Sequence, residues 1–130
     1  MLSLSGPGAV YGADGTFIYQ QAVNAFNDSH TGVQVQLIFE DGKSSGRDAT
    51  SAAEKLIHID KVDLLFGGNY SSEVLASAMI SQPFQIVNLS AVAESPEINN
   101  VGEYVYKWLD SSFETTALSR YLLHQQVEKI

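Results

Sequence analysis

The chain has 130 residues, of which 45% are hydrophobic and 17% charged, a composition that supplies a packed core and excludes a disordered chain. Its 15 acidic and 7 basic residues give a net charge of -8, which excludes the basic surface that nucleic-acid binding requires. The absence of cysteine excludes disulfides, thiolate zinc sites and cysteine nucleophiles.

The first part of the chain is predicted to form a strand, a helix and a second strand. The first strand covers Met1–Leu4 and leads into a glycine-rich turn over residues 5–12. Asp14 is predicted to cap the helix, and apolar residues at helical spacing mark one of its faces: Ile18, Ala22, Ala25 and Phe26. Residues 33–40 alternate between apolar and polar side chains, which predicts the second strand.

The middle of the chain continues this alternation of helix and strand. Residues 49–57 have the apolar spacing of an amphipathic helix, and residues 62–66 form a short strand that two glycines stop. Ser71 or Ser72 is predicted to cap the next helix, which Pro83 ends.

The last part is predicted to hold two strands and a helix. The strands cover residues 86–89 and 104–109, with a long loop between them. Asp110 or Ser111 is predicted to open the final helix, which carries Ala117, Leu118, Tyr121, Leu122 and Gln125 on one side. The first strand is short, and the chain stops where a further strand is expected, so we expect a sheet that is incomplete at both ends.

This order of elements predicts one α/β domain over residues 1–130. Strands that alternate with helices imply right-handed crossovers and a three-layer architecture with a mainly parallel sheet, of Rossmann-like or flavodoxin-like type. Ligands bind such sheets at the carboxyl ends of the strands. The start lacks the basic region and long apolar run of a signal peptide, and no run is long enough for a membrane span.

The turn Gly6–Gly12 is similar to a dinucleotide-binding fingerprint, with Glu40 placed where an acid could hold a ribose. Its third glycine comes one position late, and Pro7 removes an amide that could contact phosphate. We favour a turn with another use and keep a nucleotide-dependent enzyme as an alternative function.

The turn Gly67–Ser72 joins a strand to a helix. Free N–H groups and the helix dipole favour an anion there, such as a ligand carboxylate, and the two serine hydroxyls add donors. The alternative is that one serine only caps the helix. The sequence leaves both interpretations open.

The sequence gives little support for metal binding, serine hydrolysis or acid/base catalysis. His30, His58 and His124 lack metal-ligand spacing, so we expect no metal. No Gly-x-Ser-x-Gly motif is present, and Glu94 and Glu97 are interpreted as solvated loop carboxylates rather than an acid/base pair. We therefore expect a protein that is not an enzyme and uses no cofactor.

Several segments follow one another in an order and spacing more specific than any one of them: Leu4–Gly12, Phe39–Ser44, Ala52–Ile57, Asp60–Asp63, Gly67–Ser72, Ser95–Ile98 and Tyr104–Lys107. Together they resemble the N-terminal lobe of the type I periplasmic binding proteins. This branch includes the leucine/isoleucine/valine-binding proteins of ABC importers. The resemblance covers nearly the whole chain.

The resemblance implies two α/β lobes that close on a small ligand as a hinged clamp. Carried over by position, Tyr11, Ser71 with its neighbours Tyr70 and Ser72, and the stretch Val92, Ala93 and Glu94 fall where the first lobe touches ligand. In the amino-acid binders a serine and a threonine hold the ligand carboxylate. Ser71 matches the serine, but Glu94 stands at the threonine position and would repel a carboxylate. This leaves open amides, ureas and cationic ligands.

The resemblance also implies the function and partners. The parent protein is expected outside the cytoplasm, where it would capture a small polar solute and deliver it to an ABC permease. A ligand-sensing domain of a receptor or regulator with the same fold is the other alternative. Because later segments complete such a lobe, we expect this chain to form a homodimer, with exchange of the helix over residues 112–127 as one route.

Overall fold

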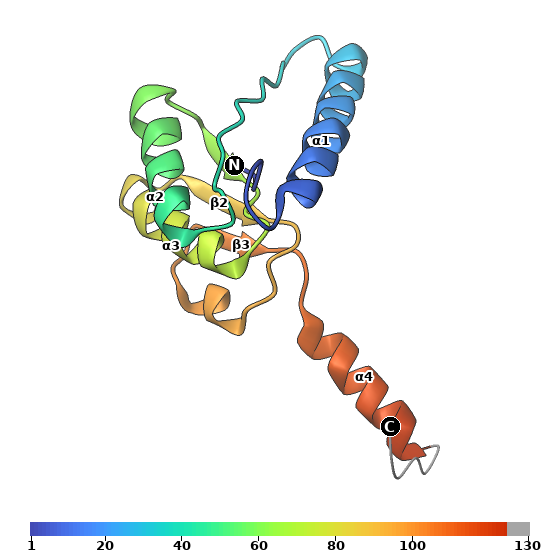
Figure 1. Cartoon of the computed structure of the whole chain (residues 1–130). Coiled ribbons are helices and arrows are strands. Elements are labelled where there is room, and N and C mark those ends of the chain that lie inside the picture. The colour runs from blue at the N-terminus through green and yellow to red at the C-terminus, as the bar shows by residue number, and fades with distance from the viewer. Residues whose placement is uncertain (125–130) are drawn as a thin grey trace.

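Figure 1 shows the computed structural model of the chain, which describes residues 1–124. Predictions for residues 125–130, including Gln125 and the end of the exchanged helix, lie outside the described residues. The helices and strands in chain order are α1 Ala9–Ser29, α2 Gly46–Glu54, β1 Leu64–Phe66, α3 Ser71–Ser81, β2 Val87–Ser90, β3 Val105–Lys107 and α4 Ser111–His124. The π-helical turn Lys55–Ile59 continues α2, and the 3-10 turns are Gln82–Phe84 and Pro96–Asn100.

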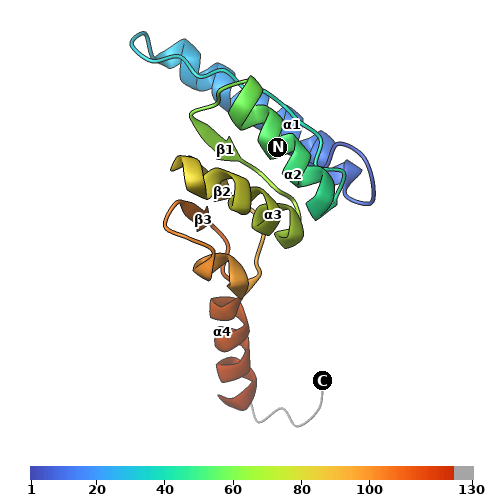
Figure 2. The same ribbon diagram turned by 90° about the vertical axis from the view of Figure 1, so that its left-hand side faces the viewer.

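The three named strands form a parallel sheet in the order β1-β2-β3. In its register Leu65 lies beside Asn88, and Asn88 beside Val105. Helices α2 and α3 cover one face, whereas α1 lies on the other side of the sheet (Figures 1 and 2). The N-terminal segment runs beside β1, where the Met1 amino group donates to the Phe66 carbonyl and the Gly68 N–H donates to the Met1 carbonyl. The prediction of a three-layer α/β domain with a mainly parallel sheet is confirmed.

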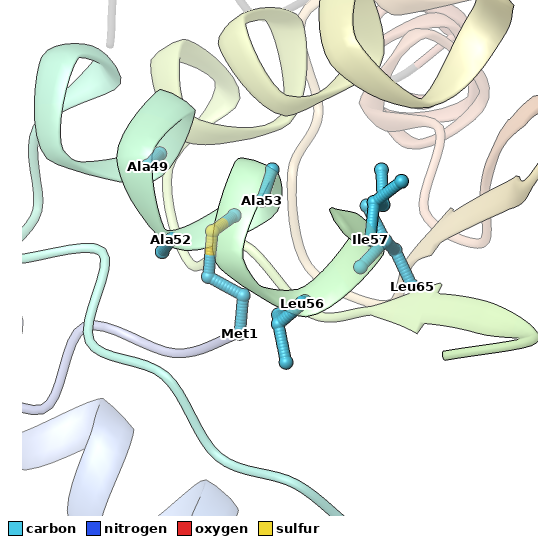
Figure 3. Close-up of a cluster of buried hydrophobic side chains, with 7 residues drawn as sticks. All are labelled: Met1, Ala49, Ala52, Ala53, Leu56, Ile57 and Leu65. Carbon is cyan, nitrogen blue, oxygen red and sulfur yellow. The ribbon is translucent and has the colours of Figure 1, made fainter. Parts of the chain in front are cut away.

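The core lies between the sheet and helices α2 and α3. Small side chains let these helices approach closely, and the apolar residues around them form two buried clusters. The first, drawn in Figure 3, contains Met1, Ala49, Ala52, Ala53, Leu56, Ile57 and Leu65. The second contains Val74, Ala78, Ala93, Ile98 and Val105.

Helix α1 begins at Ala9, inside the segment 5–12 that was predicted to be a turn, so the prediction that Asp14 caps the helix is wrong. Asp14 lies inside the helix. Pro7 supplies a φ suited to a helix start, and the Gly12 N–H already donates to the Gly8 carbonyl. A Cβ at Gly12 would lie 2.1 Å from the Ser3 carbonyl oxygen, so this glycine lets α1 cross the N-terminal segment.

The strands predicted over Met1–Leu4 and residues 33–40 are not formed. Only one isolated parallel bridge, between Leu2 and Asp41, joins the two segments. Residues 33–39 are extended but lack a neighbouring strand, and the side-chain amide of Asn27 holds Val35 instead. A cleft of about 620 Å³ separates this segment from residues 60–66. The alternation of apolar and polar residues therefore predicted the extended conformation of this segment, but not its lack of a paired strand.

Helix α4 extends away from the rest of the molecule in both views (Figures 1 and 2). Its apolar side chains Leu118, Tyr121 and Leu123 are 57%, 62% and 78% exposed. On the side predicted to gather apolar residues, Ala117, Leu118 and Tyr121 are thus exposed and Leu122 is half-buried. Within the same range, no helix is both long and apolar enough to cross a membrane.

Candidate functional site

Four loops meet at the carboxyl ends of the strands: residues 3–8, 41–45, 67–73 and 90–95, here called the carboxyl-end loops. Hydrogen bonds join them in pairs. The Ser3 N–H donates to Asn69 Oδ1 at 2.9 Å, and the Ser90 hydroxyl donates to the Gly68 carbonyl at 3.2 Å. This edge is where open parallel sheets bind ligands, so the loops form the candidate site.

Asp41 organises the first two loops. Its carboxylate accepts from the N–H groups of Leu4, Ser5 and Lys43 and from the Ser5 hydroxyl, which lies 2.6 Å away. Desolvation raises the pKa of Asp41, but these four hydrogen bonds outweigh it and lower the pKa below its ordinary value. The carboxylate is therefore held ionised as a structural acceptor.

Glu73 joins three of the loops from beneath. Its side chain is fully buried, and its two carboxylate oxygens both lie 2.9 Å from the Ser3 hydroxyl. Oε1 accepts from the Ser44 N–H at 3.2 Å, and Oε2 from the Tyr70 N–H at 3.0 Å. Sequence reasoning missed this residue, although a glutamate at the third helical position is half of a capping box.

The amino group of Met1 lies close to the same carboxylate. It donates to the Phe66 carbonyl at 2.8 Å. Burial lowers the pKa of this group to about 6, even though the nearby charges of Glu73 and Glu40 raise it.

The start of α3 differs from the prediction in one respect. Tyr70, not Ser71 or Ser72, is the N-cap. Ser71 and Ser72 are instead the first two helical residues, and within residues 1–124 their N–H groups have no hydrogen-bond acceptor. The half-buried Ser71 Oγ accepts from the Ser95 N–H at 3.1 Å, which leaves its own proton to donate.

The stretch Val92–Glu94 lies next to Ser71 through that bond. Val92 is 44% exposed, and Glu94 is exposed, whereas the Ala93 side chain is buried in the core. Ala93 can therefore present only its backbone to a ligand. Lys107 Nζ donates to the Glu94 carbonyl at 3.0 Å, and a cleft of about 400 Å³ opens beside the pair.

The two tyrosines are placed differently. A Cβ at Gly8 would lie 2.7 Å from Tyr70 Cε2, so the Tyr70 ring covers the glycine-rich turn. Tyr11 stands on α1 with 65% of its surface exposed. No hydrogen bond or ring contact of residues 1–124 joins Tyr11 to the other candidates. The structure brings together Tyr70, Ser71 and residues 92–95.

The glycines of the turn serve packing within the chain. A Cβ at Gly6 would lie 2.7 Å from the Lys43 carbonyl oxygen, and one at Gly8 would lie 2.9 Å from Ser44 Oγ. The space that a phosphate would need above Gly8 is filled by Tyr70 and Ser44. This packing favours the interpretation of Gly6–Gly12 as a structural turn over its interpretation as a dinucleotide-binding loop.

A metal ion would need a group of side chains that could bind it together. Among residues 1–124, no group of three or more histidine, aspartate or glutamate side chains could hold a metal ion.

Comparisons with solved structures show where this fold occurs. LivJ from Streptococcus pneumoniae, in complex with isoleucine, has 23% identity and a TM-score of 0.77 over 82% of this chain and 31% of its own. The leucine-binding protein LivK from Thermotoga maritima has 20% identity and a TM-score of 0.76 over 93% of this chain and 35% of its own. An ABC-transporter solute-binding protein from Rhodopseudomonas palustris, in complex with 3,4-dihydroxybenzoic acid, has 19% identity and a TM-score of 0.75. The match covers 82% of this chain and 29% of that protein.

At these identities the likeness establishes the fold. The chain spans about a third of the length of these structures. No curated protein matches it. The family model described as periplasmic binding protein, however, matches residues 1–130, the entire printed sequence. The chain therefore belongs to the periplasmic binding protein family.

Proposed function

We propose that residues 1–130 are part of the first lobe of a two-lobe solute-binding protein. The parent would be the extracytoplasmic component of an ABC importer and would deliver its ligand to a membrane permease. Family membership supports this, as does the form of the carboxyl-end loops. The observation that carries it is the start of α3, where the unpaired N–H groups of Ser71 and Ser72 stand beside a hydroxyl with a proton to donate.

The ligand we propose is small and polar: an amino acid, an amide or a related compound. The two ligands seen in the solved structures, isoleucine and 3,4-dihydroxybenzoic acid, both carry a carboxyl group. The Glu94 side chain is exposed in this chain, so water screens its repulsion of such a group. Helix dipole and serine donors favour an acceptor oxygen, whether from a carboxylate or an amide.

We propose that all seven candidate positions contribute a side chain or backbone group to the site of such a ligand. Tyr70 would pack against it, and Ser71, Ser72 and the backbone of Val92–Glu94 would hold its polar groups. Tyr11 would contribute from α1. A closed site needs a second lobe, because half a clamp neither excludes water nor supplies the remaining contacts.

Ser71→Ala in the full-length parent is the test. Losing this donor should weaken ligand binding by about 1–3 kcal/mol. Stability should change by less than about 1 kcal/mol, because Tyr70 rather than Ser71 caps the helix. Ser51→Ala, at an exposed position of α2, is the matched control. Calorimetry that finds unchanged affinity for Ser71→Ala would remove Ser71 from the site.

The alternatives predict different results. A nucleotide-dependent enzyme should show a raised melting temperature when NAD(P) is added. Because Tyr70 and Ser44 fill the space above Gly8, we expect no rise in melting temperature. A ligand-sensing domain would bind the same solutes, and only the downstream sequence or neighbouring genes separate sensing from transport.

We also propose that the chain associates with itself. Large apolar side chains are exposed on α1 and α4, among them Phe17 at 68% and Leu123 at 78%. Monomers seldom leave such surface uncovered, and a two-fold dimer is the commonest way for identical chains to cover it.

A further inference from the structure

Glu73 is a carboxylate with no accessible surface and no salt-bridge partner within residues 1–124. Burying a charge costs free energy unless hydrogen bonds compensate it. Here the compensation comes from the Ser3 hydroxyl and the N–H groups of Ser44 and Tyr70. Each donor belongs to a different carboxyl-end loop, so one side chain connects three segments far apart in sequence.

The segment held at Ser44 is strained. Lys43 and Ser44 both have left-handed backbone angles, with φ of 51° and 57°. Such conformations are uncommon for residues with side chains and persist only when their surroundings fix them. Asp41 accepts the Lys43 N–H, and Glu73 accepts the Ser44 N–H. The two carboxylates thus fix this pair of residues.

The effect of Glu73 continues into the glycine-rich turn. Ser44 Oγ accepts from the Gly8 N–H at 2.9 Å, so the position of Ser44 sets that of Gly8. Gly42 leaves room for the arrangement, because a Cβ there would lie 2.3 Å from Glu73 Oε1. On the other side, the bond to the Tyr70 N–H fixes the residue that precedes Ser71.

We propose that Glu73 is the positioning residue of the ligand site: its buried carboxylate holds the loop 41–45 and the start of α3 in the relative arrangement that binds ligand. It does not itself touch ligand, because its side chain is fully buried. The inference rests on the proposed function, since it concerns the same site.

Glu73→Gln tests the proposal with little change of shape. Glutamate accepts the Ser44 N–H on one oxygen and the Tyr70 N–H on the other, whereas glutamine has one acceptor oxygen and one donor nitrogen. One of the two segments must therefore be released. Amide hydrogen exchange of Ser44 or Tyr70 in the 130-residue chain should become at least tenfold faster, while Asn88 in β2 changes less than twofold.

The matched control is Glu54→Gln, at an exposed position of α2, which should leave all these exchange rates unchanged. Ser3→Ala is the second variant, for use if Glu73→Gln does not fold. It removes only the hydroxyl that contacts both carboxylate oxygens and should accelerate the same amides by a smaller factor.

The second readout is ligand affinity in the full-length parent. Glu73→Gln should weaken binding at least tenfold while the protein remains folded. Unchanged exchange at both Ser44 and Tyr70 would overturn the proposal, as would faster exchange with unchanged affinity. If the unmutated parent binds no solute, the proposed function fails and the positioning role fails with it, whereas the exchange rates still report whether Glu73 holds the loops.

Discussion

Helices α2 and α3 differ from α1 and α4 in what their apolar residues touch. Both α2 and α3 are short and bury their small apolar side chains, such as Ala53 and Val74, completely. Helix α1 is the longest in the described part of the chain, yet its single buried residue is Gly12. Its Phe17 is 68% exposed, and Leu118 of α4 is 57% exposed.

The difference shows that apolar periodicity and burial are separate properties. All four helices carry apolar residues at helical spacing. Helices α2 and α3 pack closely against each other, whereas α1 meets the sheet through Tyr19, whose ring lies edge-on to that of Phe66 at 4.8 Å. The carboxyl-end loops are attached to the buried helices α2 and α3, because Glu73, which holds three of these loops, belongs to α3. The site is therefore built on the well-packed part of the molecule, while α1 and α4 present exposed apolar surface.

Leu56→Ala should give the largest effect, because Leu56 is 2% exposed in the first core cluster. Its truncation should lower the free energy of unfolding by about 2–5 kcal/mol. Phe17→Ala on α1 should lower it by less than about 0.5 kcal/mol. Urea denaturation at low protein concentration measures both. Equal losses would show that α1 is packed as firmly as α2.

Gly12→Ala tests how α1 is attached. In an exposed helix this change stabilises by about 1 kcal/mol. Here the new Cβ would lie 2.1 Å from the Ser3 carbonyl oxygen, so we expect a net loss of about 1–3 kcal/mol. Gly32→Ala is the control, because no atom lies within 4 Å of its Cβ position. Thermal unfolding that ranks Gly12→Ala as the more stable variant would contradict this contact.

Self-association should depend on the exposed helices. Light scattering at low concentration should give a mass of two chains or more, with the net charge of -8 limiting further aggregation. Leu118→Glu together with Leu123→Glu should weaken association at least tenfold, which is about 1.4 kcal/mol. A stable monomer of 14.1 kDa for the unmodified chain would refute the proposed association.

The smallest effect concerns Asp41. Its pKa is lowered in the folded state, so its contribution to stability is present above the ordinary carboxyl pKa and is lost as the pH falls through the lowered value. Ser5→Ala removes the hydroxyl bond and should raise the pKa of Asp41 toward the ordinary value. Carboxyl titration followed by NMR measures this, and a pKa unmoved by Ser5→Ala would assign the shift to the backbone donors alone.

Sequence patterns predicted the elements that pack locally. The helices over residues 49–57 and from Ser71, and the strands near residues 64–66 and 87–90, follow from apolar spacing and from the glycines and proline that stop them. Pairing over residues 33–40 was predicted wrongly, because alternation describes a side-chain pattern and not a partner strand.

The site was predicted in part. The sequence correctly placed the turn at Ser71 beside the loop that carries Val92–Glu94, because strand ends of a parallel sheet converge, and the binding role of these residues stays a prediction. Glu73 was not found, because a glutamate in a helix is normally exposed and only the folded chain brings Ser3 and Ser44 to it. The capping role given to Ser71 or Ser72 failed by one position, since Tyr70 takes it with its backbone.

The central claim is that the carboxyl-end loops are one half of a solute site. NMR titration of the 130-residue chain with a panel of amino acids, amides and polyols tests it most directly. The account predicts amide shifts at Ser71, Ser72 and residues 92–94, with a dissociation constant of about 1 mM or weaker. Micromolar binding would contradict the half-site, and shifts confined to the cleft between residues 33–39 and 60–66 would contradict the location.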